Sequence, residues 1–148
     1  MSRFVGPHSD TLTLDNGDTL TVRRRLNMGE QRESVHACRE VAPDGSVTFD
    51  TTKLGLAKVA AYLLDWRLTE APPLRQPDGR PIALEDRIAV LDNLDPADFA
   101  ELKDAIDAHE QRQIAARLEE KKRAATTNAA PTTRSPFAAA GTSTGSAN

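Results

Sequence analysis

The segment from Asp95 to Arg123 constrains the fold of this chain more than any other. Asp95 can cap a helix, Pro96 fits the first helical position, and the acid in the first turn suits the helix dipole. A helix from Pro96 to Arg123 would be roughly 42 Å long. A globule of the size that this chain allows is only about 35 Å across. Part of this helix is therefore expected to project.

The apolar pattern of this segment stops before the helix does. Phe99, Leu102 and Ile106 share one face, but the continuation of that face is polar from Gln113 onward. Packing is therefore expected to end near His109.

Two aliphatic residues follow on a different face. Ile114 and Leu118 form an i,i+4 pair that is rotated away from the earlier stripe. If this part of the helix projects and is mostly polar, no hydrophobic core is available to bury them. They are the candidate partner-binding residues of this chain.

Acidic residues recur at every third position of the same segment. Each step of three residues on an α-helix falls short of a full turn by about 60°, so these side chains spiral around the helix instead of converging. We expect a solvated helix whose charges match its dipole, acidic first and basic last, and neither a catalytic carboxylate pair nor a metal site. The residues are Asp95, Asp98, Glu101, Asp104, Asp107 and Glu110.

The N-terminal part alternates threonine with aliphatic residues on both sides of a turn sequence, which predicts a β-hairpin. A two-residue turn at Asn16-Gly17 would place apolar side chains opposite polar ones. Pairing on the same face predicts a longer loop or a bulge instead. The expected pairs are Leu14 with Leu20 and Leu12 with Val22.

Further elements follow from capping and periodicity. Asn27 and Glu30 predict a capping box that opens a short helix to about Arg39. A strand is expected at 47–49, a proline-rich loop at 71–81 and a two-turn helix at 84–91. A core helix is expected to begin at Thr51 or Thr52. Its apolar face would carry Leu56, Val59, Ala60, Leu63 and Trp66.

These elements define an α+β fold: an N-terminal β-hairpin or small antiparallel sheet with packed helices, a long projecting C-terminal helix and a disordered tail. We expect a flexible N-terminus at 1–9 and one domain at 10–123. That domain would be β-rich at 10–50 and helical at 51–123. The low-complexity segment 124–148 carries Arg134 as its only charge and is expected to be disordered.

Composition limits the function classes. The chain has 148 residues, a net charge of −3 and a single cysteine, Cys38. One cysteine forms no internal disulfide, which fits a reducing compartment such as the cytosol. The N-terminus has no signal-peptide pattern, and no apolar run is long enough to span a membrane. The overall charge gives no support for nucleic-acid binding, since Arg23–Arg25 is the one basic cluster and is expected to be exposed on a strand.

No catalytic signature stands out either. The chain has no phosphate-binding glycine loop, no Gly-x-Ser-x-Gly and no His-Glu-x-x-His. His36 and Cys38 would point apart on a helix, and Cys38 is expected to be a small core residue. We therefore expect a protein that is not an enzyme and that uses no cofactor or metal.

Three stretches together resemble tail assembly chaperones of long-tailed, siphovirus-like bacteriophages or prophages. They are Asp18–Val22 leading to Leu26–Glu30, then Ala61–Leu68, then Leu94–Pro96 with Phe99 and Ala105–Glu110. The resemblance implies a protein of the host bacterial cytoplasm that binds the phage tape measure protein, shields its apolar stretches and assists assembly of tail tube protein. It provides no catalytic residues to carry over. On the charge and hydropathy described above, neither nucleic acid nor a membrane is expected as a partner.

Two other readings remain open. The chain could be a structural virion component of the neck or tail, which stays in the particle. It could also be a small nucleic-acid-binding regulator, for which Arg23–Arg25 is the support. The sequence leaves the oligomeric state open.

Overall fold

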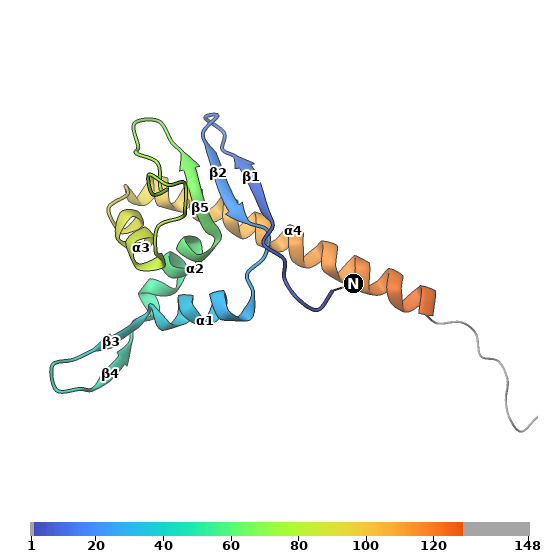
Figure 1. Cartoon of the computed structure of the whole chain (residues 1–148), viewed down its shortest axis with the longest axis horizontal. Coiled ribbons are helices and arrows are strands. Elements are labelled where there is room, and N and C mark those ends of the chain that lie inside the picture. Colours follow the sequence, from blue (N-terminus) through green and yellow to red (C-terminus); the bar gives the residue numbers. More distant parts are fainter. Residues whose placement is uncertain (1, 129–148) are drawn as a thin grey trace, which may run out of the picture. The chain divides into compact units, whose positions relative to one another are not determined.

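The computed structural model describes residues 2–128. The chain divides into two compact units, Met1–Ile114 and Ala115–Asn148, which are described separately. The first unit is α+β, with a small antiparallel sheet and packed helices (Figure 1). In chain order the elements are β1 (Ser9–Thr13), β2 (Thr19–Arg23), α1 (Met28–His36), β3 (Arg39–Val41), β4 (Val47–Phe49), the 3-10 helix η1 (Thr51–Lys53), α2 (Leu54–Tyr62), β5 (Leu63–Arg67), α3 (Leu84–Asp92) and the long C-terminal helix α4 (Pro96–Asn128).

The predicted N-terminal hairpin is β1 and β2, and its loop is longer than the Asn-Gly pair suggests, as expected. Gly17 adopts a φ of 91°, and the Leu14 N–H donates to the Asp18 carbonyl oxygen at 2.8 Å. This geometry is typical of a three-residue loop that ends in a left-handed glycine. The register keeps the aliphatic residues of both strands on one face of the hairpin, as the alternation requires.

The predicted residue pairs were nevertheless wrong. Leu12 faces Leu20, and Val22 faces Asp10. With three residues in the loop, Leu14 lies opposite Asp18 instead of Leu20. The pattern of alternation constrained the face of each strand but left the register free to shift by two residues.

The central helix is shorter than its periodicity predicted. α2 ends at Tyr62 and β5 begins at the next residue, so Leu63 and Trp66 lie on a strand and not on a helix. Both are buried, and they face Val22 and Leu20 of β2. A shift of register between Thr21 and Val22 allows residues three apart on β5 to reach the same core.

The sheet order is therefore β1-β2-β5, with β2 in the centre. A spacing of three residues suits both a helical face and a bulged strand. β5 pairs with β2 through Leu63, Asp65, Trp66 and Arg67, and this tertiary pairing decided between the two.

Helix α1 begins with the predicted capping box: the Asn27 side chain accepts from the Glu30 N–H at 2.9 Å, and the Glu30 carboxylate accepts from the Asn27 N–H at 2.8 Å. The helix ends at His36, before the expected Arg39. Arg39 instead begins β3, which pairs with the predicted strand β4 as a separate two-stranded ribbon.

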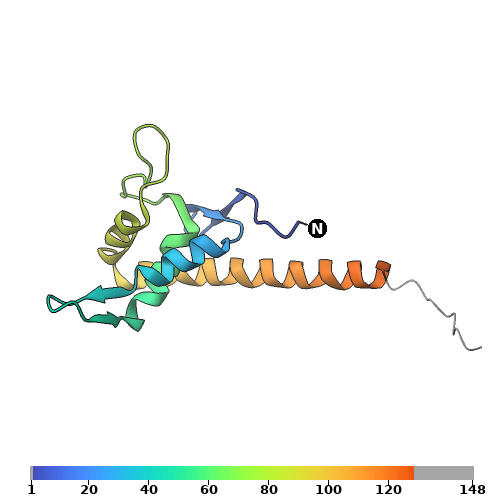
Figure 2. The ribbon, with the colours of Figure 1, turned by 60° about the horizontal axis from the view of Figure 1, so that its bottom comes forward.

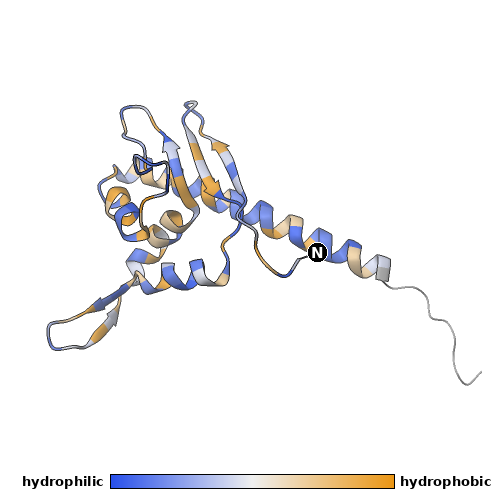
Figure 3. Cartoon of the chain, in the orientation of Figure 1, coloured by the Kyte–Doolittle hydropathy of each residue, from blue (hydrophilic) through white to orange (hydrophobic). Residues whose placement is uncertain are grey.

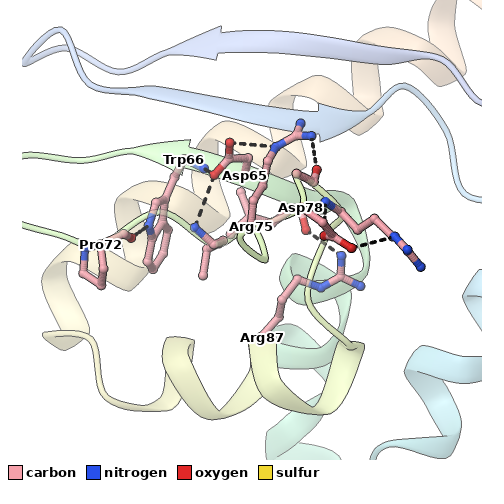
Figure 4. A network of polar contacts seen from close by, with 10 residues as sticks. Asp65, Trp66, Pro72, Arg75, Asp78 and Arg87 are labelled. Atoms are coloured by element: carbon pink, nitrogen blue, oxygen red, sulfur yellow. Dashed lines mark hydrogen bonds and ion pairs between the residues drawn. The ribbon is translucent and has the colours of Figure 1, made fainter.

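The loop after β5 is irregular, as its prolines predict, and side chains of β5 hold it in place (Figure 4). The Trp66 indole N–H donates to the Pro72 carbonyl oxygen at 2.7 Å, and the Arg75 guanidinium donates to the Asp65 carboxylate at 2.9 Å. Arg87 of α3 is buried and donates to a backbone carbonyl of β5 at 3.0 Å. These contacts fasten both the loop and α3 to the edge strand.

The core is aliphatic apart from Tyr62 and Trp66. Its buried members come from the sheet, from α2 and α3, from the first half of α4, and from two loop positions, Leu14 and Leu74. They are Leu14, Leu20, Val22, Val59, Ala60, Tyr62, Leu63, Trp66, Leu74, Leu91, Leu102 and Ile106.

Helix α4 begins as predicted, because the Asp95 carboxylate accepts from the Ala97 N–H at 2.8 Å. Its end was predicted too early, since the helix continues past Ala124 to Asn128. The rest of the expected disordered tail, 129–148, lies outside the described residues. Within residues 2–128, no helix combines the length and the apolar character that a membrane span requires.

Candidate partner-binding surface

The first half of α4 is anchored in the core. Leu102 and Ile106 are buried and Phe99 is half-buried, as the apolar stripe predicted. His109 is the last buried residue of the described part of this helix, where only 2% of its surface is exposed. The prediction that packing ends near His109 is confirmed.

Two backbone oxygens hold the His109 ring. Its Nε2 lies 3.1 Å from the carbonyl oxygens of both Arg23 and Arg24. Carbonyl oxygens only accept, so Nε2 carries the proton in this contact. The ring also meets Tyr62 edge to face, with ring centroids 6.1 Å apart. This histidine joins α4 to the end of β2.

The polar residues beside His109 form a second anchor, centred on Lys58 of α2. The Lys58 ammonium lies 2.9 Å from the Asp107 carboxylate and 2.7 Å from the Glu110 carboxylate. The Tyr62 hydroxyl donates to Glu110 at 2.8 Å. Asp107 and Glu110 were expected to be plain solvated residues. That expectation was wrong, because residues three apart on a helix share a face and both reach one lysine.

The pKa values in this group follow its contacts. Burial opposes the charge on Lys58, but the bonds to Glu110 and Asp107 outweigh it and raise the Lys58 pKa. Burial also opposes the charge on Asp107, yet the bonds from Lys103 and Lys58 lower the Asp107 pKa. Burial and the bond to Glu110 raise the pKa of Tyr62. Lys58, Asp107 and Glu110 therefore form an ion-paired group, called the Lys58 clasp below, in which Lys58 and Asp107 favour each other's charged form.

Beyond the clasp the helix has no buried residue in its described part. Ile114 is 47% exposed and Leu118 is 53% exposed. Ile114 ends the first unit and Leu118 belongs to the second, and both lie on α4. Residues four apart on a helix are surface neighbours, so these two side chains form a short aliphatic stripe along α4. Figure 3 shows hydrophilic residues over much of the length of this helix.

The arginine cluster is engaged within the chain. Arg23 lies 2.8 Å from the Glu30 carboxylate and also donates to the backbone of α2. Arg24 lies 2.9 Å from the Asp10 carboxylate, and this bond lowers the Asp10 pKa. Two of the three arginines thus neutralise carboxylates of their own domain.

The remaining candidate residues form no chemical centre. Cys38 is fully buried two residues after the end of α1, as expected for a core residue, and burial raises the pKa of its thiol. Among residues 2–128, no three His, Cys, Asp or Glu side chains come together as metal ligands would. A hollow of about 590 Å³ between α1 and α3 is lined by Arg32 and His36 but also by Glu33 and Glu85. Its mixed charges select no ligand class.

The structure contains a second exposed apolar group, which the sequence patterns did not predict. It comprises Val41, Val47 and Phe49 on the β3–β4 ribbon. The turn Pro43-Asp44-Gly45 between two valines was its sequence signal, but the predicted helix ran to about Arg39, which is the first residue of β3.

Comparison of the chain with protein-family models, with curated proteins and with solved structures finds no match.

Proposed function

We propose that this protein is a non-catalytic phage tail assembly chaperone. In this proposal it binds the tape measure protein in the host bacterial cytoplasm and assists assembly of the tail tube protein. The observation that carries the proposal is the exposed pair Ile114 and Leu118 on α4.

The pair is hard to explain by folding alone. Burial along α4 stops at the His109 contact and the Lys58 clasp, so neither residue contributes to the hydrophobic core. The apolar face of an amphipathic helix in a partner protein can cover such a stripe. A tape measure protein consists of long amphipathic helices, whose apolar faces would aggregate if left uncovered.

The test is co-expression of the tagged full chain with the neighbouring tape measure and tail tube genes, followed by pull-down. We expect the wild-type chain to capture the tape measure protein. The double variant Ile114→Ser with Leu118→Ser should lose capture. A matched control, Ala116→Ser with Glu120→Ser, changes an exposed i,i+4 pair on another face of the same helix and should keep it.

Two results would overturn the proposal. Absence of capture by the wild-type chain would remove the chaperone function. Retention of the protein in purified particles at fixed stoichiometry would identify it as a structural virion component instead.

A further inference from the structure

The β3–β4 ribbon carries an unpaired apolar face. Its register pairs Arg39 with Phe49, Glu40 with Thr48 and Val41 with Val47. Because side chains alternate along a strand, Val41, Val47 and Phe49 share one face with Arg39. The three apolar side chains are 71%, 50% and 45% exposed, respectively. Figures 1 and 2 both show the ribbon extending away from the β1-β2-β5 sheet.

The hydrogen bonds fix which backbone groups of the ribbon are free to pair. The Asp50 N–H donates to Cys38 and the Ala42 N–H donates to Ser46, each at 2.8 Å. In an antiparallel pair, bonded and non-bonded positions alternate, so Thr48 bonds inward to β3. Val47 and Phe49 therefore point their N–H and C=O groups to the outer edge of β4.

The two outer edges of the ribbon differ in charge. β3 reads Arg-Glu-Val, and pairing two copies of it about its centre would set Glu40 against Glu40, which is unfavourable. β4 reads Val-Thr-Phe and has no charge. Pairing two copies of β4 about its centre sets Thr48 against Thr48 and Val47 against Phe49.

We propose that two copies of this chain associate through β4, forming a continuous β3-β4-β4-β3 sheet across a two-fold axis. The outward N–H and C=O groups of Val47 in one copy bond those of Phe49 in the other. β4 fits itself because its donors, acceptors and apolar side chains all match under that symmetry. An uncharged edge strand is otherwise an aggregation hazard, and a two-stranded ribbon alone is only marginally stable. This association is independent of the partner-binding role of α4.

The axis position gives a direct test. Thr48 would face its own copy at a non-hydrogen-bonded pair, where Cα atoms are about 4.5 Å apart. This distance is within the range that a disulfide bridges. The full chain carrying Thr48→Cys should therefore form a covalent dimer under mild oxidation. Glu40→Cys, on the same face but on β3, is the matched control and should remain monomeric, because two copies of it would be separated by both β4 strands.

Charge exchange tests the same pairing without oxidation. Thr48→Lys and Thr48→Glu should each lower the dimer fraction seen by analytical ultracentrifugation, because like charges then meet at the axis. Mixing the two variants should restore it. Circular dichroism checks that each variant is folded.

Three outcomes would overturn the proposal. They are a wild-type chain that stays monomeric at all accessible concentrations, equal crosslinking at positions 40 and 48, and loss of the dimer in Val41→Lys but not in Thr48→Lys. The last would mean that the ribbons pack face to face instead of edge to edge.

Discussion

His109 on α4 and Arg23 on β2 are 86 residues apart in the sequence, yet the His109 Nε2 lies 3.1 Å from the Arg23 carbonyl oxygen. The same nitrogen reaches the Arg24 carbonyl oxygen. His109 is the last buried residue in the described part of α4, so this contact lies at the end of the packed stretch of the helix.

Replacing His109 should therefore destabilise the first unit. His109→Leu keeps the apolar volume but removes a donor to two partly buried carbonyl oxygens, and it should cost about 1–3 kcal/mol. His109→Gln retains a side-chain N–H and should cost less. Urea unfolding of both variants measures the difference. A His109→Leu variant as stable as wild type would mean that water replaces the lost donor.

Trp66 is a second structural anchor. Only 3% of it is exposed, it faces Leu20, and its indole N–H bonds the Pro72 carbonyl oxygen. Trp66→Ala should cost roughly 3–5 kcal/mol of unfolding free energy. Trp66→Phe keeps most of the apolar volume but leaves the carbonyl without its donor, so we expect a loss of about 1–3 kcal/mol. A folded Trp66→Ala variant that had lost only partner binding would assign this residue to an interface.

Local sequence signals predicted the elements of this fold that depend on local chemistry. The capping box at Asn27 and the Asp95-Pro96 helix start were identified correctly, because each uses side chains within three residues of one another. The strand β5 was not, because Leu63 and Trp66 also fit a helical face. Only pairing with β2, more than 40 residues earlier in the chain, selects the strand.

The candidate site was likewise predicted only in part from the sequence. Exposure of Ile114 and Leu118 followed from the end of the apolar stripe on α4. The bonds from Lys58 to Asp107 and Glu110 did not, because they join residues on two helices whose packing the sequence does not fix. The apolar face of the ribbon was missed for a third reason: β3 has only three residues, too few to display alternation.

The Lys58 clasp predicts a pH dependence. Asp107 has its pKa lowered in the fold, below its ordinary value of 3.8, so its stabilising contribution is complete above that value. The contribution is lost as the pH falls through the lower, folded value. The free energy of unfolding should decline on acidification below about pH 4, and Asp107→Asn should reduce that slope. Urea unfolding at a series of pH values measures it.

The control for this effect is Asp104→Asn, which removes one charge from an exposed position of the same helix. It separates the loss of the bonds to Lys58 and Lys103 from the change in net charge. Equal slopes for the two variants would mean that the clasp contributes nothing specific.

At alkaline pH the sign of the effect reverses. The Lys58 pKa is raised, so its contribution is complete below 10.5 and is lost as the pH rises through the folded value.

The last prediction concerns the stability of the partner-binding stripe. Ile114→Ser with Leu118→Ser removes two side chains that are about half exposed, so the free energy of unfolding should change by no more than about 0.5 kcal/mol per site. The Ala116→Ser with Glu120→Ser control accounts for the lower helix propensity of serine. Leu102→Ser, at a buried position of the same helix, should instead cost about 3 kcal/mol or more. If the Ile114 and Leu118 variant lost as much stability as Leu102→Ser, the stripe would belong to the folded core and its role in binding would be wrong.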